Sequence, residues 1–185
     1  GKYLLYHGNL AVPENYKAAM ELALNVFSKV DMKCVIAGNN PPKELQTLCE
    51  KYANIELKTN LTTDAIHKVI SEAHINVLHT NQNTGIKLKL LNALYRGKFA
   101  VVNPLMVVDS GLESLCAIGE NWKEIVAKIE EYRLLDYSGA YHENRKDYLA
   151  KHFGNDTSAA ALLEKIDFPS EKTATRRADN KVLKG

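Results

Sequence analysis

The stretch TGIKLKLLNALYRGKFAVVN, residues 84–103, contains a turn, an amphipathic helix and an apolar strand in direct succession. Leucines recur at the spacing of one helical face, and Gly97 ends the helix before the strand. Lys87 and Lys89 fall in the first helical turn, where unpaired backbone N–H groups and the helix dipole disfavour cations. An anion bound in front of this helix would offset that unfavourable placement.

The rest of the chain repeats the alternation of helix and strand. Short apolar or β-branched runs separate longer segments of helical period, which is typical of βαβ units and a parallel sheet. The expected strands are residues 2–8, 33–38, 55–58, 74–80, 98–103 and 114–119. The expected helices between them are 14–29, 42–52, 62–72, 86–96 and 121–132. The sequence therefore predicts an α/β fold with an open parallel sheet and helices on both faces.

The pattern changes beyond about residue 120. Residues 121–132, 141–153 and 156–166 are predicted to be successive helices with no strand between them. We interpret them as a helical C-terminal extension of one domain, residues 1–168. Residues 169–185 are rich in charge and poor in large apolar side chains, which predicts a flexible basic tail.

Composition narrows the classes of function. The chain has 185 residues, 45% hydrophobic and 25% charged, which is ordinary for one globular domain. Its net charge of +2 comes from the last seventeen residues, which carry five basic and two acidic side chains. Because a nucleic-acid binder carries its basic excess on the folded body, we expect no nucleic-acid partner.

The three cysteines are widely spaced, so they suggest neither a disulfide framework nor a metal or redox pair. The sequence contains no signal peptide and no apolar run long enough to span a membrane. These features favour the reducing cytoplasm. The chain begins almost directly with an apolar strand, which we expect of a piece cut from a longer protein.

Three loops at the expected carboxyl ends of strands are polar or contain glycine. They are residues 7–15, 37–42 and 79–85. Ligands of open parallel sheets bind at this edge. Gly8 and Asn9 directly precede a helix, whose free N–H groups suit phosphate oxygens, although a simple turn glycine explains Gly8 as well. Thr84 is the last of five neutral hydrogen-bonding side chains ahead of Gly85.

Lys89, Asn92 and Arg96 share one face of the helix 86–96. An anionic polar ligand at the helix start would use the lysines and the free N–H groups together. The alternative is a solvated helix face with no ligand.

Common nucleotide and catalytic motifs are absent. The sequence has no G-x-x-x-x-G-K-[ST] loop, no G-x-G-x-x-G fingerprint, no G-x-S-x-G elbow and no H-E-x-x-H helix. The six histidines show no metal-ligand spacing within one element. His7 and His79 end two expected strands, either as polar strand-end residues or, for His7, as a hydrogen-bond donor to a ligand.

Four segments together resemble one family. YHGNL....N..AA......F, VIAGNNPP..L, NI......T......I..A.I.VLHT and the opening stretch are similar, in order and spacing, to the C-terminal half of retaining glycosyltransferases called group one or family four. The resemblance covers about residues 3–150. It implies a Rossmann-like half of a GT-B fold that binds a nucleotide sugar. It also implies an N-terminal half, missing from this chain, that binds the acceptor.

The resemblance has gaps at charged positions. Residues 84–103 are similar to the pattern E-G-x-G-x-P-x-x-E-A-M-A-x-G-x-P-V-V, whose two glutamates contact the donor sugar and the ribose in the family. Thr84 and Asn92 stand at those two positions. Asn9 replaces an arginine and Glu14 or Asn15 replaces a lysine, both of which hold the donor diphosphate in the family. The lysines on the helix 86–96 are expected to restore that charge; otherwise transfer activity is lost.

The expected function is donor binding in a glycosyltransferase that moves a sugar from a nucleotide sugar to a glycan or lipid-linked acceptor, in polysaccharide or cell-envelope synthesis. The catalytic residues are unassigned, and we expect neither a metal nor another cofactor. The expected donor-binding residues are Gly8, Asn9, Thr84, Gly85, Lys87, Lys89 and Asn92. The alternative is a non-catalytic GT-B-like module that binds a nucleotide or a partner.

The resemblance also sets expectations for this chain alone. Transfer needs an acceptor held against the donor, so residues 1–185 alone should transfer no sugar. Apolar residues of the extension are expected at its surface, where they would favour self-association. They are Tyr141, Tyr148, Leu149 and Phe153. The expected location is the cytoplasm, with peripheral contact at the inner membrane face as an alternative.

Overall fold

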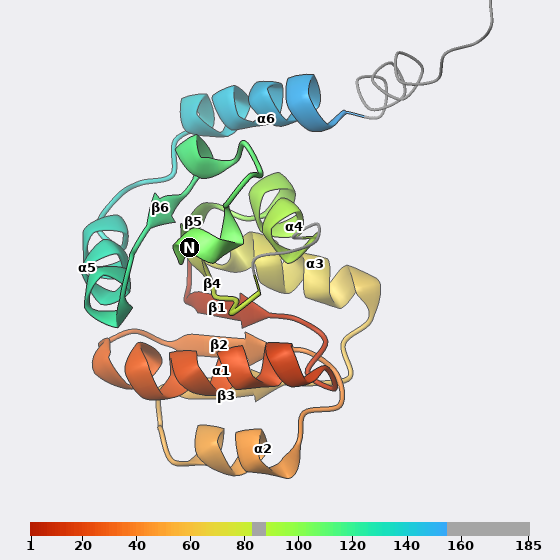
Figure 1. Ribbon diagram of the computed structural model, residues 1–185, viewed down its shortest axis with the longest axis vertical. Coiled ribbons are helices and arrows are strands. Elements are labelled where there is room, and N and C mark those ends of the chain that lie inside the picture. Colours follow the sequence, from red (N-terminus) through yellow and green to blue (C-terminus); the bar gives the residue numbers. More distant parts are fainter. Residues whose placement is uncertain (83–87, 155–185) are drawn as a thin grey trace, which may run out of the picture. The chain divides into compact units, whose positions relative to one another are not determined.

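A parallel sheet of six strands organises the chain (Figure 1). The structure is a computed structural model, which describes residues 1–82 and 88–154. The strands are β1 (Leu4–His7), β2 (Cys34–Ala37), β3 (Ile55–Lys58), β4 (Ile75–Leu78), β5 (Phe99–Val102) and β6 (Ala117–Ile118). Their order is β3-β2-β1-β4-β5-β6, and every neighbouring pair is parallel. This is the strand order of the Rossmann fold, so the predicted fold class is confirmed.

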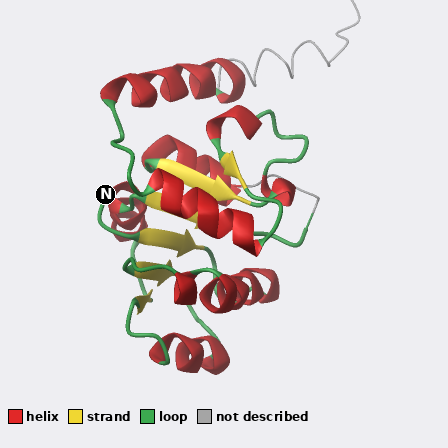
Figure 2. Cartoon of the chain, turned by 90° about the vertical axis from the view of Figure 1, so that its left-hand side faces the viewer, coloured by secondary structure: helices red, strands yellow, loops and turns green. Residues whose placement is uncertain are grey.

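Helices cover both faces of the sheet (Figure 2). The helices are α1 (Pro13–Asn25), α2 (Lys43–Glu50), α3 (Thr63–Glu72), α4 (Leu88–Arg96), α5 (Trp122–Tyr132) and α6 (Gly139–Phe153). α1 packs against α2, and α3 packs against α4. Crossovers between parallel strands are right-handed, and the chain reverses its direction across the sheet after β3. The two helix pairs therefore fall on opposite faces.

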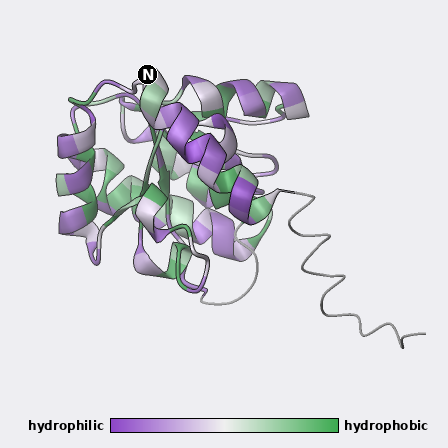
Figure 3. Cartoon of the chain, turned by 90° about the horizontal axis from the view of Figure 1, so that it is seen from above, coloured by the Kyte–Doolittle hydropathy of each residue, from purple (hydrophilic) through white to green (hydrophobic). Residues whose placement is uncertain are grey.

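The strands are continuous apolar runs because both faces of the sheet are covered. Every residue of β1, β2, β4 and β5 is buried. One core cluster lies where α3 packs on β1 and β2; its members are Tyr3, Leu5, Val35, Ala37, Val69, Ile70 and Ala73. The Tyr3 hydroxyl donates to the Val69 carbonyl at 2.8 Å, which satisfies its only polar atom inside the cluster. Figure 3 shows the hydrophobic residues gathered on the strands and the inward sides of the helices.

Several element boundaries differ from the expected ones. The helix expected over 14–29 ends at Asn25, and its last part is a separate 3-10 helix, η1 (Phe27–Lys29). The strand expected over 114–119 is reduced to Ala117–Ile118. Two short 3-10 helices, η2 (Pro104–Met106) and η3 (Glu113–Leu115), precede it. The expected cap of α3 is present, because the Thr62 side chain accepts from the Ala65 N–H at 3.2 Å.

The contacts of the chain separate two compact units, Gly1–Lys146 and Asp147–Gly185. The third helix expected near the C-terminus and the tail lie outside the described residues. Of the four apolar residues expected at the surface of the extension, Tyr141 is exposed and Tyr148 and Phe153 are half-buried, whereas Leu149 is buried. In the part of the chain that the structure describes, no helix has the length and apolarity needed to cross a membrane.

Arg145 links α6 to the end of α4. Its side chain is buried, and its guanidinium donates to the backbone carbonyls of Gly97 and Lys98. The guanidinium carbon also lies 5.2 Å from the centre of the Tyr137 ring. The last carbonyls of a helix have no partner within the helix, and a planar donor fork can satisfy two acceptors beyond it. Arg145 therefore holds the turn between α4 and β5.

Candidate functional site

The strand order reverses between β1 and β4, which makes the carboxyl ends of these strands the expected ligand crevice. The loop after β1 carries Gly8 and Asn9, and α4 follows the loop after β4. The Lys89 ammonium on α4 donates to the Asn15 amide oxygen at 2.7 Å, and the Asn15 amide nitrogen donates to the Asn9 carbonyl at 3.0 Å. The structure thus brings together Gly8, Asn9 and Lys89.

Lys89 is half-buried rather than solvated. Besides Asn15, its ammonium contacts the Tyr6 hydroxyl at 3.4 Å and lies 5.4 Å from the centre of the Tyr6 ring. Both of these partners are uncharged. Asn92 and Arg96 on the same helix are exposed. The alternative of a solvated face therefore fits these two residues and does not fit Lys89.

The loops after β1 and β2 are in close backbone contact. The Gly8 N–H donates to the Ala37 carbonyl at 3.1 Å. A Cβ on Gly38 would lie 1.9 Å from the Gly8 carbonyl oxygen, so glycine is required at position 38. The loop after β2 also contacts the loop after β3, because the Asn39 side-chain oxygen accepts a hydrogen bond from the Leu61 N–H at 3.1 Å.

The loop after β4 is fixed to β5 and to α1. The Thr80 N–H donates to the Asn103 amide oxygen at 3.2 Å, and the Asn103 amide nitrogen donates to the Thr80 carbonyl at 2.8 Å. The Thr80 hydroxyl donates to Oε1 of Glu14 on α1 and accepts from the Gln82 N–H at 3.2 Å. Thr80 and Asn103 are both buried, so the start of this loop, residues 79–82, is held in place.

His79 joins the same crevice through α1 and α5. Its Nε2 lies 3.1 Å from Oε2 of Glu21 and 3.1 Å from the Asn81 amide oxygen, and its ring packs on Trp122 at 4.5 Å. Burial lowers the pKa of His79, which outweighs the opposing effect of the Glu21 carboxylate. These contacts agree with the interpretation of His79 as a polar strand-end residue.

His7 is buried at the end of β1. Burial, with a smaller contribution from the charge of Lys89, lowers its pKa from 6.5 to about 4. The ring is therefore neutral at pH 7. Among the described residues, its Nε2 has no hydrogen-bond partner.

We expect the buried His7 to make stability depend on pH. In the unfolded chain this histidine binds a proton near pH 6.5, whereas in the folded chain it does so only near pH 4. Stability should therefore fall as the pH is lowered from about 6.5 towards 4. Urea unfolding should show that the wild type has a lower free energy of unfolding at pH 5 than at pH 7. The difference should be smaller in the His7→Asn variant. An NMR titration of His7 with a midpoint near 6.5 would contradict its burial.

A pocket of about 420 Å³ opens beside these loops. Its residues come from the ends of β1 and β2 and from the start of α3; they are His7, Gly8, Asn9, Ala37, Gly38, Asn39, Asn40, Leu61 and Ile66. Small-molecule sites typically have volumes of roughly 300 to 1,000 Å³ and a few polar groups on mostly apolar walls. This pocket fits an uncharged planar group next to Gly8.

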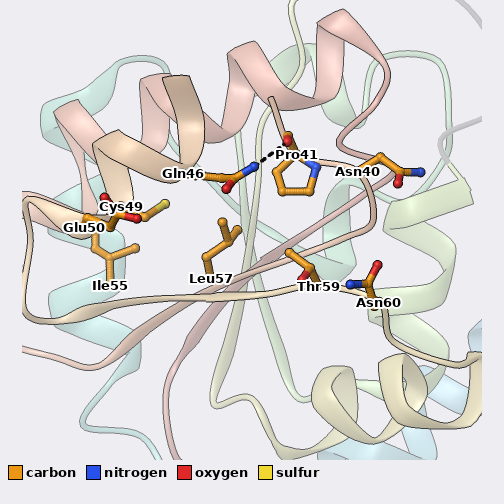
Figure 4. A pocket seen from close by; sticks show the side chains of 9 residues that line it. All are labelled: Asn40, Pro41, Gln46, Cys49, Glu50, Ile55, Leu57, Thr59 and Asn60. Carbon is orange, nitrogen blue, oxygen red and sulfur yellow. Dashed lines mark hydrogen bonds between the residues drawn. The ribbon is translucent and has the colours of Figure 1, made fainter. Parts of the chain in front are cut away.

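A larger pocket of about 760 Å³ lies between α2 and the edge strand β3 (Figure 4). It is lined by Asn40, Pro41, Gln46, Cys49, Glu50, Ile55, Leu57, Thr59 and Asn60. The Gln46 amide donates to the Pro41 carbonyl at 2.9 Å across its rim. Burial raises the pKa of the Cys49 thiol to about 11, so the thiol is neutral at pH 7. No lysine or arginine lines the pocket, so it does not suit a phosphate.

The remaining predicted site residues are placed unequally. Thr84, Gly85 and Lys87 lie outside the described residues, and Asn92 is exposed on α4. Within residues 1–82 and 88–154, no three side chains of His, Cys, Asp or Glu are grouped as metal ligands. The expectation that no metal is needed stays a prediction.

Sequence reasoning did not assign five residues of the crevice to the site. They are Tyr6, Asn15, Gly38, Thr80 and Asn103, which contact the predicted residues or hold their loops. Glu14 and Asn15 were noted only as alternatives at one substituted position of the family pattern, and Thr80 only as one of the polar residues of the loop 79–85. The sequence signal that could have found such residues is a polar side chain within a few residues of a strand's carboxyl end. Ordinary loops without a ligand show the same signal.

Comparison with known proteins decides the family. A family model described as "Glycosyl transferases group 1" matches residues 1–133, which is well over half of the chain. The chain belongs to the group 1 glycosyltransferases. The resemblance seen in the sequence is thereby confirmed.

Solved structures show that this glycosyltransferase domain has the fold of one half of GT-B proteins. AviGT4, a glycosyltransferase involved in avilamycin A biosynthesis, is 17% identical with a TM-score of 0.63, over 89% of this chain and 50% of that chain. OtsA without ligand is 12% identical with a TM-score of 0.65, and the match covers 91% of this chain and 44% of that chain. A glycosyltransferase from Rickettsia africae ESF-5 is 11% identical with a TM-score of 0.65, and the match covers 89% of this chain and 47% of that chain. The chain thus spans half or less of each of these structures. No curated protein matches it closely enough to count as a relative.

Proposed function

We propose that this glycosyltransferase domain binds the nucleoside diphosphate of a nucleotide-sugar donor at the reversal of its strand order. The observation that carries the proposal is the Lys89 ammonium, which Asn15 and Tyr6 hold beside the loop after β1. A phosphate oxygen placed there receives a charge-assisted hydrogen bond, which is about twice as strong as a neutral one. The positive charge of Lys89 also lowers the pKa of both His7 and His79, so its field extends across the crevice.

The pocket beside Gly8 suits the nucleobase. It adjoins the loop that would face the diphosphate, and Leu61 and Ile66 offer apolar surface to a flat ring. The amide groups of Asn39 and Asn40 supply hydrogen-bonding edges, of which the Asn39 oxygen already holds Leu61. A base in this pocket would place its diphosphate towards Gly8 and Lys89.

The full protein, in this proposal, transfers the sugar to a glycan or lipid-linked acceptor in the cytoplasm or at the inner membrane face, in polysaccharide or cell-envelope synthesis. No metal ion takes part, because basic side chains and helix N-termini stabilise the leaving diphosphate. One solved structure similar to this domain, that of TarM from S. aureus, contains UDP. It is 16% identical, so it supports the fold and leaves the nucleotide to be tested.

The second candidate is a non-catalytic nucleotide- or partner-binding module. It is favoured by the Glu14 carboxylate in the crevice and by the lack of any lysine or arginine in residues 7–12. Both features weaken the attraction for a diphosphate relative to a loop with basic residues. Nucleotide binding without sugar transfer by the full-length protein would favour this second candidate.

We expect the Lys89→Ala variant to bind nucleotide more weakly by roughly 1 to 3 kcal/mol, the size of a hydrogen bond to a charged group. Calorimetry with UDP, GDP, ADP and CMP identifies the nucleotide for the wild type, and the variant is then titrated with the same compound. Because Lys89 is half-buried, the variant should also lose a little stability, which thermal melting measures.

The matched control is Lys43→Ala, which removes an exposed lysine from the first turn of α2. It should change neither the binding free energy nor the free energy of unfolding by more than about 0.5 kcal/mol. If millimolar nucleotide neither releases heat nor raises the wild-type melting temperature, the proposed donor site is rejected.

A further inference from the structure

Glu14 offers one carboxylate oxygen to the crevice. It lies in the first turn of α1 and is half-buried. Its Oε1 accepts a hydrogen bond from the Thr80 hydroxyl, across the reversal of the strand order. Within residues 1–82 and 88–154, its Oε2 has neither a hydrogen-bond nor an ion-pair partner. One oxygen therefore anchors the group, and the other is left to accept.

The anchor of Glu14 is rigid. Thr80 is 1% exposed, and the side chain of Asn103 bonds both its N–H and its carbonyl. A carboxylate held at one oxygen by such a residue loses little conformational freedom when a ligand binds the other oxygen. Glu14 is therefore pre-organised as an acceptor.

A second carboxylate on the same helix shows the contrast. Glu21 is committed to the protein, because its Oε2 lies 3.1 Å from Nε2 of His79 and 3.2 Å from the Asn81 amide nitrogen. Both contacts hold the loop after β4. Glu14 and Glu21 thus share the crevice, and Glu14 alone of the two has an oxygen without a described partner.

The chemistry beside Glu14 specifies the class of ligand. The Lys89 ammonium contacts the Tyr6 hydroxyl, and the Glu14 carboxylate adds to the effect of burial in raising the pKa of Tyr6, so a cation and a carboxylate both lie near Tyr6. A phosphate is attracted to the ammonium and repelled by the carboxylate, whereas a hydroxyl donates well to a carboxylate. The pair therefore suits a molecule that has an anionic group joined to a polyol.

We propose that Glu14 is a specificity-determining residue that accepts a hydrogen bond from a hydroxyl of the donor, on the ribose or on the transferred sugar. This inference rests on the proposed function, because it assumes that the diphosphate lies near Lys89. Glu14 selects for the polyol part of the donor, and Lys89 holds the anionic part.

The test is the Glu14→Gln variant, which removes the charge and keeps the size. The glutamine oxygen still accepts from the Thr80 hydroxyl, so the contact between α1 and the loop after β4 survives. Calorimetry compares UDP, GDP and ADP with UDP-glucose, GDP-mannose and ADP-glucose. We expect the variant to weaken binding of the best nucleotide sugar between about 10- and 100-fold, the range for a hydrogen bond to a charged group.

The matched control is Glu44→Gln, which removes an exposed glutamate from the second position of α2, as Glu14 is in the second position of α1. It costs the same interaction with the helix dipole and lies outside the crevice. Equal melting temperatures of the two variants separate ligand recognition from folding.

The pattern across the probes identifies the hydroxyl. If the variant binds only the nucleotide sugar more weakly, the contact is made by the transferred sugar. If the variant binds the nucleoside diphosphate and its sugar conjugate more weakly by the same factor, the contact is made by the ribose. The 2′- or 3′-deoxy nucleoside diphosphate should then bind the wild type and the variant with equal affinity. Unchanged or tighter binding of every probe overturns the inference and leaves Glu14 as a clamp on Thr80. If the wild type binds none of the six probes, the proposed function fails instead, so the two failures are distinguishable.

Discussion

Replacing Gly38 by alanine is expected to destabilise the domain by about 3 kcal/mol, near the upper end of the usual cost of overpacking. The added Cβ would lie 1.9 Å from the Gly8 carbonyl oxygen and 2.8 Å from Cγ of Leu10. Leu10 is fully buried, and the Gly8 N–H is bonded to the Ala37 carbonyl, so neither neighbour can retreat freely. Relief of the clash must separate the loops after β1 and β2.

The same separation should disrupt the pocket beside Gly8 and so abolish measurable nucleotide binding by the Gly38→Ala variant. Urea unfolding gives the stability change, and calorimetry with the nucleotide chosen on the wild type gives the affinity. The control is Gly139→Ala at the start of α6, where a Cβ meets nothing within 4 Å. That variant should be neutral or more stable by up to about 1 kcal/mol, since alanine is the better helix former. A Gly38→Ala protein as stable as the wild type would show that the two loops do not touch.

Replacing Arg145 by alanine should cost a similar amount, about 3 kcal/mol, for a different reason. The change leaves the buried carbonyl of Gly97 and the partly buried carbonyl of Lys98 without their donor, and it removes the contact with the Tyr137 ring. Each buried acceptor left unsatisfied costs about 1 to 3 kcal/mol. The turn between α4 and β5 should therefore loosen.

Denaturant unfolding of Arg145→Ala is compared with Lys146→Ala on the neighbouring, exposed position of α6. The lysine variant should stay within about 0.5 kcal/mol of the wild type. Arg145→Lys should recover only part of the loss, because an ammonium cannot reproduce the planar fork that reaches two carbonyls. A cost below about 1 kcal/mol for Arg145→Ala would contradict its assignment as the link between α6 and α4.

Local pattern was enough to predict the elements of this fold. The apolar runs of β1, β2, β4 and β5 are buried along their whole length, and such runs occur where helices cover both faces of a sheet. Boundaries were less accurate, as with the helix expected over 14–29. It ends at Asn25 and is followed by η1, in which Phe27 is fully buried, and helical periodicity does not encode this break.

Local pattern also explains why some of the predicted site residues lie close together. Gly8, Asn9 and Lys89 follow the carboxyl ends of strands, and such loops meet at one edge of a parallel sheet. Glu14 and Thr80 are separated by 66 residues, and Thr80 and Asn103 by 23, so no motif of fixed spacing marks them. Lys89 was expected near the crevice, but its placement against Tyr6 and Asn15 was not.

The sequence by itself determined the alternation of strands and helices, the polar loops and the resemblance to group 1 glycosyltransferases, because these follow from neighbouring residues and from spacing along the chain. Only the tertiary structure decided which loops face each other. That depends on the strand order β3-β2-β1-β4-β5-β6, which places β4 beside β1 through crossovers on opposite faces of the sheet. Hydrogen bonds such as those of Glu14 with Thr80 and of Lys89 with Asn15 form only across this junction, since they join residues that approach each other solely after the sheet has assembled.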